Sequence, residues 1–398
     1  MKILLLSSFY PPVGRGGAEK AASLLAQALV QAGHQVSVIT FHPQSDETVE
    51  LCDGVRVHRI PLDNFYFPLG STDRKPAWMR LLWHLRDSWN WNAAARVGRI
   101  LDLEQPDVVH SHVLAGFSVA VWREVRRRKI RLVHTLHDYY MLCVRSSMFS
   151  DGQVCAQRCT GCKLITGARK ATSHQVDALV SVSGHVLDQH RRFGYFDGVP
   201  GSVIFNVLDV PPSPTSPLSL PPPAGLVFGF IGKLEEPKGI GLLLAATARM
   251  KRQDWRLRIA GSGLDAYAND LKAQFPDPRI EWLGFTSPAD FYRSIDVAVV
   301  PSIWGDPLPY VTIEALFAGR SLICARSGGI PQIAALGRVV SLFPAGDVAA
   351  LAERMDDALA TPGPWRGGGF LDPRSADLFA APVVADEYLK TYVASGSA

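Results

Sequence analysis

Short apolar runs alternate with amphipathic stretches in the first half of the chain. The run Ile3–Leu6 leads through a glycine-rich loop into Ala18–Gln31, where apolar residues recur every three or four positions before Gly33. This spacing predicts a buried strand and then an amphipathic helix that ends near Gly33. Further buried strands are expected at Val36–Thr40, Val55–Ile60, Val108–Ser111, Leu132–Thr135, Ala178–Val182 and Val203–Phe205.

The alternation restarts after a stretch at 211–223 that holds seven prolines in thirteen positions. Because proline fixes φ and donates no backbone hydrogen bond, we expect a stiff, exposed connector there. Beyond it we expect strands at Leu226–Ile231, Leu257–Ala260, Ile280–Leu283, Val297–Val300 and Leu322–Cys324, and helices at Ile240–Met250 and Val311–Phe317.

Strands that alternate with helices are typical of doubly wound parallel sheets. The sequence therefore predicts two Rossmann-like α/β domains, at 1–207 and 225–382, joined by a linker at 208–224. Two such domains are expected to face each other across a cleft, with the ligand outside the carboxyl ends of the strands.

Composition excludes several classes of protein. The 398 residues are 47% hydrophobic and 20% charged, which fits a globular protein and excludes collagen-like, coiled-coil and largely disordered chains. A net charge of +4 is too small to favour a nucleic-acid partner. The apolar run after Met1-Lys2 is too short for a signal peptide, and no run is long enough to span a membrane. With only six cysteines, a cytoplasmic protein is expected.

In the first half, glycines and histidines follow the expected strands. The loop Pro11–Glu19 contains Gly16 and Gly17 and opens into a helix, so it suits an anion, although a plain tight turn is the alternative. It lacks the G-x-G-x-x-G pattern of nicotinamide-binding proteins. His110, His112, His134 and His137 lie near strand ends as candidate metal ligands, acid–base groups or hydrogen-bonded structural residues. His137 is the strongest functional candidate, because it lies just past its strand.

In the second half, lysines and carboxylates stand at the corresponding places. Lys233 and Lys238 follow the strand Leu226–Ile231 and suit a diphosphate, with a solvated charged loop as the alternative. Glu314 lies in an apolar helix, where a carboxylate needs hydrogen bonds such as ribose hydroxyls would supply. Asp306, on the preceding loop, can meet the hydroxyls of a sugar.

Taken together, these segments resemble the GT-B glycosyltransferases of family 4, a retaining group that uses nucleotide sugars. The resemblance covers most of the chain. It rests on the order and spacing of the first glycine-rich loop, His137-Asp138, Phe205-Asn206, Gly232-Lys233-Leu234-x₃-Lys238-Gly239, Gly261-Ser262-Gly263, Trp282-Leu283-Gly284 and Asp306-x₇-Glu314.

The resemblance implies a role for each matching residue. Glu314 would hold the ribose, Asp306 the donor sugar, Lys238 the diphosphate, and His137 would face the transferred sugar, so that His137, Asp306 and Lys238 are the expected catalytic residues. The donor-binding set is expected to comprise Gly16, Gly17, Gly232, Lys233, Lys238, Gly261, Gly263, Leu283, Asp306, Tyr310, Val311 and Glu314.

Three residues depart from the family pattern. Asp306 is one methylene shorter than the usual glutamate, and Lys233 replaces an arginine, so it lacks the bidentate fork. Pro309 offers no amide, which leaves Tyr310 and Val311 as donors. We expect these departures to change specificity.

The implied function is hexosyl transfer with retention from a UDP- or GDP-sugar, without a catalytic metal. The acceptor would be a saccharide, a lipid-linked saccharide or a small molecule, in cell-surface polysaccharide or glycoconjugate synthesis. The first domain would bind the acceptor and the second the donor, and the segment 383–398 would pack back on the first domain. The alternatives are a nucleotide-sugar 2-epimerase, a non-catalytic sugar-nucleotide binding protein and a metal-dependent hydrolase. A GT-A enzyme is disfavoured because the chain has no Asp-x-Asp pair.

Two further segments carry candidate interactions. Trp78–Arg86, followed by Trp89 and Trp91, and the basic cluster Arg123–Arg131 suit peripheral contact with an anionic membrane, such as the inner face of the plasma membrane. The alternative is an ordinary packed helix with a solvated charged end.

Four cysteines fall within twenty residues, with the spacing C-x₁₁-C-x₃-C-x₂-C. The short final separation lets two thiolates meet one tetrahedral ion, so we expect a structural zinc ion. Disulfides are the alternative. The expected ligands are Cys143, Cys155, Cys159 and Cys162.

Overall fold

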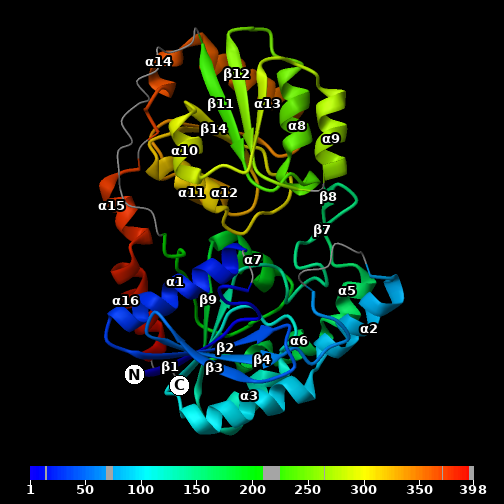
Figure 1. Ribbon diagram of the computed structural model, residues 1–398, viewed down its shortest axis with the longest axis vertical. Helices are drawn as coiled ribbons and strands as arrows, with labels where there is room; N and C mark the ends of the chain where they lie inside the picture. The colour runs from blue at the N-terminus through cyan, green and yellow to red at the C-terminus, as the bar shows by residue number, and fades with distance from the viewer. Residues whose placement is uncertain (14–15, 69–74, 209–224, 264, 370, 394–398) are drawn as a thin grey trace. The chain divides into compact units, whose positions relative to one another are not determined.

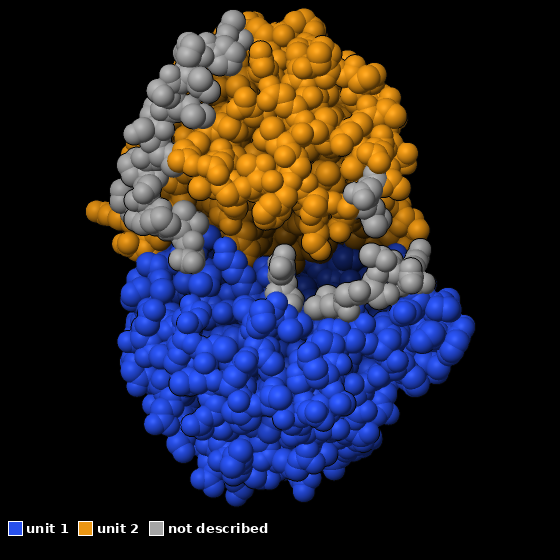
Figure 2. Space-filling model, in the orientation of Figure 1, with its two compact units in different colours: residues 1–148, 156–209, 378–398 blue, residues 149–155, 210–377 orange. Residues whose placement is uncertain are grey.

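The computed structural model describes residues 1–13, 16–68, 75–208, 225–263, 265–369 and 371–393. The chain divides into two compact units, coloured separately in Figure 2. Unit 1 comprises residues 1–148, 156–209 and 378–398, and unit 2 comprises 149–155 and 210–377. The expected proline-rich linker lies, except for Leu208, outside the described residues.

Unit 1 is built on an eight-stranded sheet (Figure 1). Its strands are parallel except for β3, which runs antiparallel to β4. From edge to edge, the order is β10 (Gly201–Val203), β9 (Ala178–Ser181), β6 (Arg131–Leu136), β5 (Val108–Ser111), β1 (Lys2–Leu6), β2 (Gln35–His42), β4 (Val55–Pro61) and β3 (Thr48–Cys52).

Helices cover this sheet, and they include the last helix of the chain. The longer ones are α1 (Gly17–Gln31), α2 (Ala77–Ser88), α3 (Trp91–Glu104), α4 (Ala120–Arg127), α7 (Gly184–Arg192) and α16 (Ala381–Val393), with short helices α5 (Thr160–Ile165) and α6 (Gly167–Thr172). Val384, Tyr388 and Tyr392 of α16 are buried in the same core as Leu25 and Leu29 of α1. The chain end therefore completes the core of unit 1.

Unit 2 is built on a six-stranded, all-parallel sheet. Its strand order is β13 (Ile280–Gly284), β12 (Trp255–Ala260), β11 (Leu226–Ile231), β14 (Val297–Val300), β15 (Ser321–Arg326) and β16 (Val340–Pro344). The short hairpin β7 (Phe149–Ser150) and β8 (Gln153–Val154) is assigned to the same unit.

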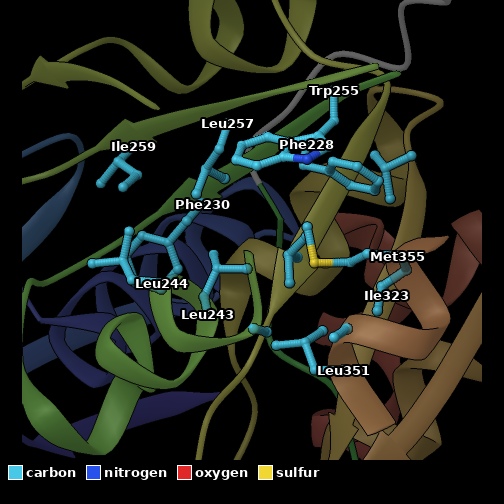
Figure 3. Packing of buried hydrophobic residues seen from close by; sticks show 14 of the residues in the cluster. Phe228, Phe230, Leu243, Leu244, Trp255, Leu257, Ile259, Ile323, Leu351 and Met355 are labelled. Atoms are coloured by element: carbon cyan, nitrogen blue, oxygen red, sulfur yellow. The ribbon is translucent and has the colours of Figure 1, made fainter. Parts of the chain in front are cut away.

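The helices of unit 2 lie on both faces of its sheet. They are α8 (Ile240–Thr247), α9 (Asp265–Gln274), α10 (Pro288–Arg293), α11 (Tyr310–Phe317), α12 (Ile330–Ala334), α13 (Val348–Ala360), α14 (Pro362–Trp365) and α15 (Pro373–Ala376). Figure 3 shows the core on one face, where Phe228 and Phe230 of β11 pack with Leu244 of α8 and Met355 of α13. On the other face, a Cβ at Gly229 would collide with Phe291 of α10.

Each sheet has a point at which its strand order reverses. In unit 2 the first strand, β11, lies between β12 and β14, and in unit 1 the first strand, β1, lies between β2 and β5. The two loops that leave such a pair of strands diverge, so a crevice opens at the carboxyl ends, where ligands of doubly wound sheets bind. The loops after β11 and β14 and those after β1 and β5 are therefore the places to look for a site.

Most of the strand predictions are confirmed, and Val108–Ser111, Leu226–Ile231 and Val297–Val300 are confirmed to the residue. The expected strand Val203–Phe205 is wrong, because β10 covers Gly201–Val203. This edge strand is exposed along its whole length, so the buried run that follows marks where the chain leaves the sheet. Four strands, β3, β7, β8 and β16, were not foreseen.

Candidate active site

An ion pair lies at the reversal point of unit 2. The ammonium of Lys238, in the loop after β11, lies 2.5 Å from Oδ2 of Asp306, in the loop after β14. Asp306 is buried, whereas the Lys238 side chain is partly open to solvent and lies over the Trp304 ring. Since a buried carboxylate needs a partner, the lysine neutralises it while keeping hydrogen-bond donors for an anion.

Two glycines let the loops approach this closely. Gly239 has φ +76°, and a Cβ there would lie 1.9 Å from the carbonyl oxygen of Pro301. Gly328 has φ +56°, and a Cβ there would lie 2.0 Å from the carbonyl oxygen of Asp306. The amide of Ile303 also donates to the carbonyl of Pro237 at 3.0 Å. The backbone therefore fixes the ion pair.

Glu314 lies on α11, the helix that follows the Asp306 loop. It is partly buried, and the Tyr292 hydroxyl lies 3.4 Å from its Oε2 and donates to the carbonyl of Val311 at 3.0 Å. Helix α11 begins at Tyr310, with Pro309 at its N-cap position. Tyr310 and Val311 thus lie in the first turn of α11, where backbone amides have no partner within the helix and can donate to a ligand.

The remaining residues expected in unit 2 lie on loops, or in the case of Leu283 near a strand end, at the same edge of the sheet. Gly261 allows the loop after β12 to approach that after β11, since a Cβ there would lie 1.8 Å from the Gly232 carbonyl oxygen. Gly263 forms an isolated bridge with Leu234. Leu283 is 38% exposed near the end of β13. Lys233 is well exposed and 4.0 Å from Glu235, so it is the less constrained lysine.

In unit 1, Gly16 and Gly17 begin α1. Gly16 is the N-cap residue and makes no side-chain cap, and both glycines are exposed. The backbone of this first turn is therefore accessible from solvent. Gly14 and Arg15, which precede it, lie outside the described residues.

Two of the four histidines are satisfied core residues. Nδ1 of His110 lies 2.7 Å from the Tyr392 hydroxyl of α16, and its Nε2 lies 2.7 Å from Oγ1 of Thr135. Nδ1 of His134 lies 2.9 Å from the carbonyl oxygen of Ser111. For these two, the structural alternative holds.

The other two histidines form a pair. Nδ1 of His112 lies 2.8 Å from Nε2 of His137, and their rings are stacked. The far nitrogen of His112, Nε2, is buried and has no partner among the described residues. Both line a cavity of about 10 Å³, at the lower limit for holding one water molecule. One feature of the sequence pointed to His112. It stands two positions after His110, so in an extended chain the two side chains point to the same face.

Burial keeps the histidines of this region neutral. It lowers the pKa of His137 to about 4 and that of His134 to about 3, and the pKa values of His110 and His112 fall well below the usual range for the same reason. Burial also raises the pKa of Asp138 to about 6, although its Oδ1 accepts the Tyr140 amide. The histidines of this region are thus arranged for neutral hydrogen bonding rather than for charge.

The four clustered cysteines all lie in the segment between β6 and β9. Cys143 and Cys162 are buried, Cys155 is partly buried and Cys159 is exposed. In the part of the chain that the structure describes, none of the four forms a disulfide. In the described part of the chain, no three histidine, cysteine or carboxylate side chains already stand in the arrangement of a metal site.

Comparison with known proteins assigns the two halves to one family. Residues 225–361 match the profile described as "Glycosyl transferases group 1", and residues 16–206 match "Glycosyl transferase 4-like domain". An uncharacterized 42.6 kDa protein in the cps region of Klebsiella pneumoniae is 28% identical, over 98% of this chain and 100% of that protein. A D-inositol 3-phosphate glycosyltransferase from Streptomyces bingchenggensis is 27% identical, over 97% and 89%.

Solved structures share the fold. Sucrose-phosphate synthase from Thermosynechococcus elongatus aligns with a TM-score of 0.73 at 21% identity, over 98% of both chains. Anabaena Alr3699/HepE in complex with UDP and glucose aligns with a TM-score of 0.71 at 18% identity, over 99% of this chain and 100% of that one. These likenesses support the GT-B fold expected from the sequence.

Proposed function

The chain belongs to the group 1 glycosyltransferases, and from that premise we propose that it transfers a hexosyl unit from a nucleoside-diphosphate sugar, with retention of configuration. The observation that carries the proposal is the Lys238–Asp306 pair at the reversal point of the unit 2 sheet. A cation held there by a buried carboxylate suits the diphosphate of a donor. HepE was solved with UDP, which makes UDP the first nucleotide to test and GDP the second.

Each residue has a proposed part in the reaction. Lys238 and the first-turn amides of α11, at Tyr310 and Val311, stabilise the charge of the departing diphosphate, so no metal is needed for that step. Asp306 accepts hydroxyls of the sugar, and Glu314 accepts those of the ribose. His137 contacts the transferred sugar as a neutral ring, and Gly16 and Gly17 offer their backbone to the diphosphate and the acceptor. The acceptor hydroxyl oxygen bonds to the anomeric carbon as the bond from that carbon to the diphosphate breaks, and the hydroxyl proton passes to the departing diphosphate. Because attack takes place on the face that the diphosphate leaves, the configuration is retained.

The acceptor is proposed to be a saccharide, free or lipid-linked, in the synthesis of a cell-surface polysaccharide. The support is the uncharacterized relative in a cps region, which matches 98% of this chain. Unit 1 would bind the acceptor and unit 2 the donor, with the reaction taking place in the cytoplasm.

Donor binding and turnover test the proposal. UDP and GDP are titrated calorimetrically into the wild type and into Glu314→Gln. The nucleotide that binds the wild type should bind the variant about tenfold to a hundredfold more weakly, since a charged hydrogen bond contributes about 1.5–3 kcal/mol. Tyr292→Phe is the matched control, because it removes only the hydroxyl beside Glu314 and should bind nearly as the wild type does.

A screen of nucleotide sugars then separates the alternatives. Release of nucleoside diphosphate, together with a product whose anomeric configuration is the same as that of the donor, supports the proposal. Binding without release, an inverted product, or a C2 epimer of the donor would each contradict it.

Peripheral membrane contact is proposed for one face of α2, formed by Trp78, Leu81, Leu82 and Leu85. These side chains are spaced at i, i+3, i+4 and i+7, and Trp78, Leu81 and Leu85 are all more than half exposed. Asp87, the one acidic residue of α2, is buried against Arg169. The two arginines of this helix, Arg80 and Arg86, are partly exposed, and Arg86 pairs with Asp63 at 2.8 Å. No described helix is long and apolar enough to cross a bilayer.

Vesicle sedimentation tests the α2 face. Binding to phosphatidylglycerol vesicles should exceed binding to phosphatidylcholine vesicles, and Leu81→Ser with Leu85→Ser should reduce it. Leu103→Ser is the control, because Leu103 is a similarly exposed leucine on α3. Equal sedimentation of all variants with the vesicles would contradict membrane contact through α2.

A further inference from the structure

His112 and His137 follow neighbouring strands of the unit 1 sheet. His112 comes directly after β5, and its backbone amide donates to the carbonyl of Leu6 in β1 at 2.8 Å. His137 comes directly after β6, which pairs in parallel with β5. The sheet therefore fixes the backbone of both residues at its carboxyl edge, beside the reversal point, where their side chains meet.

The hydrogen bond between the two rings is well aligned. Nδ1 of His112 lies 2.8 Å from Nε2 of His137, and the ring planes differ by 24°. The ring centres are 5.1 Å apart, which is about as far as an N···N distance of 2.8 Å allows. The two nitrogens therefore lie close to the line between the ring centres, which is the direction in which an imidazole N–H donates and a ring lone pair accepts.

A single proton lies between these two nitrogens, and either ring can carry it. Burial lowers the pKa of both imidazoles, so each ring is neutral and holds one proton. If His137 is the donor, the proton of His112 lies on its far nitrogen, Nε2. If His112 is the donor, the proton of His137 lies on Nδ1. The two arrangements therefore differ in which far nitrogen carries a proton.

The far nitrogen of His112 distinguishes the two arrangements. It is buried and has no partner among the described residues. A proton on it would make a buried donor without an acceptor, and among buried backbone groups an orphaned N–H is rarer than an orphaned acceptor. The same preference, applied to the ring, favours a bare lone pair on Nε2 of His112 and its proton on Nδ1.

The far nitrogen of His137 has a different environment. His137 is partly exposed, whereas His112 is buried. Within the described ranges, the hydrogen bond of the His137 ring is the one that its Nε2 makes with His112. Nδ1 therefore remains for a ligand, and a proton on it makes a donor for the oxygen of a sugar hydroxyl.

We infer that His112 is a positioning residue for His137. The Nδ1–H of His112 donates to Nε2 of His137, and this bond keeps the proton of His137 on Nδ1, because the hydrogen bond at one ring nitrogen sets the protonation of the other. The Nδ1–H of His137 then donates to a hydroxyl of the transferred sugar. This last step rests on the proposed function, whereas the bond between the two rings does not.

Nitrogen NMR of protein that carries isotope-labelled histidine reads the tautomer of His137 directly. The wild type should show a protonated Nδ1 and an unprotonated Nε2, and the signals are assigned by their loss in His137→Gln. A ring that carries its proton on Nε2, or a proton on both nitrogens, would overturn the inference. The spectra need no donor, so this result does not depend on whether the chain transfers a sugar.

A matched pair of variants tests the part played by His112. His112→Asn keeps an N–H donor near the place of Nδ1, and His112→Leu has a side chain of the same branched shape without a donor. His137 should keep its proton on Nδ1 in His112→Asn and shift it towards Nε2 in His112→Leu. An unchanged tautomer in His112→Leu would show that His112 does not set it. If His112→Leu does not fold, the wild-type spectrum and His112→Asn still decide.

Kinetics connect the tautomer to the reaction. With the nucleotide sugar that releases most diphosphate in the donor screen, His112→Leu should lower kcat/KM about threefold to tenfold, as for the loss of one neutral hydrogen bond. His112→Asn should recover most of that loss, and UDP, which has no sugar to contact, should bind both variants as it binds the wild type. Equal losses in both variants, or weaker UDP binding in both, would indicate a merely structural role and overturn the inference. A wild type that turns over no donor would contradict the proposed function and leave the tautomer result standing.

Discussion

The two sheets reverse their strand order in the same way but place opposite chemistry there. Unit 2 places a charged pair, Lys238 with Asp306, on two glycine-shaped loops. Unit 1 places a pair of stacked histidines, His112 and His137, whose charges are suppressed by burial. One fold thus provides one crevice for charge and another for neutral hydrogen bonds.

The difference shows how each unit handles the cost of burial. A carboxylate as buried as Asp306 must keep a cation beside it, and the backbone of two loops holds that cation in place. An imidazole avoids the same cost by giving up its proton. We infer that unit 2 is suited to the diphosphate of a donor, and unit 1 to uncharged sugar hydroxyls.

The largest expected effect comes from the glycine that joins the charged loops. Gly239→Ala adds a Cβ that would lie 1.9 Å from the Pro301 carbonyl oxygen, at φ +76°. We expect a loss of about 3 kcal/mol or more in the free energy of unfolding, from strain and from a backbone shift. Denaturant titration measures it.

Gly346→Ala is the matched control. Gly346 has φ +84° but nothing within 4 Å of its added Cβ, so it should cost only about 1–2 kcal/mol from the left-handed conformation. Equal losses in the two variants would mean that the close approach of the loops is unimportant.

The next effect distinguishes the two lysines. Lys238→Ala should weaken UDP binding about tenfold to a hundredfold, because it removes a charged contact of about 1.5–3 kcal/mol. Lys233→Ala should weaken binding less, since Lys233 is well exposed and not held by a buried partner. Calorimetric titration of both folded variants decides, and a larger loss for Lys233→Ala would reverse the assignment.

The sequence predicted the positions of the candidate residues in unit 2 better than those in unit 1. Lys238, Asp306 and Glu314 stand on loops and a helix that follow strongly apolar strands, so their position at one sheet edge could be read from the alternation. The pairing of Lys238 with Asp306 could not be predicted, because it depends on the close approach of Gly239 to Pro301. Local spacing does not encode such contacts between loops.

In unit 1, tertiary contacts decided which histidines are structural. His110 is satisfied by Tyr392, 282 positions away, and no local pattern reveals that bond. His112 was passed over in favour of His137 for the same reason, since only the packed sheet brings their rings together. The edge strands β3 and β10 were missed or displaced because exposed edges lack the apolar run on which the predictions depended.

A third prediction tests the dependence of the histidine region on the last helix. Tyr392→Phe should cost about 1–3 kcal/mol in the free energy of unfolding, since it leaves Nδ1 of buried His110 without its hydroxyl partner. Tyr388→Phe is the control, because its hydroxyl lies at the longer distance of 3.3 Å from Thr135. If the two variants lost stability equally, the His110–Tyr392 bond would have no special weight.

The smallest expected effect is the pH dependence that His137 adds to stability. Its pKa is lowered by burial to about 4, whereas an unfolded histidine titrates near 6.5. Between these values the unfolded chain binds more protons, so His137 makes the folded state less stable as pH falls from about 6.5 towards 4. The contribution of Asp138 has the opposite sign, because its pKa is raised to about 6.

Comparing wild type with His137→Gln isolates the histidine, since Asp138 is present in both. From pH 7 to pH 5.5 the wild type should lose on the order of 1 kcal/mol more than the variant in denaturant titrations. If the free energies of unfolding of wild type and variant changed in parallel with pH, the pKa of His137 would be the same in the folded and unfolded chain. The contrast between a neutral and a charged crevice would then not hold for His137.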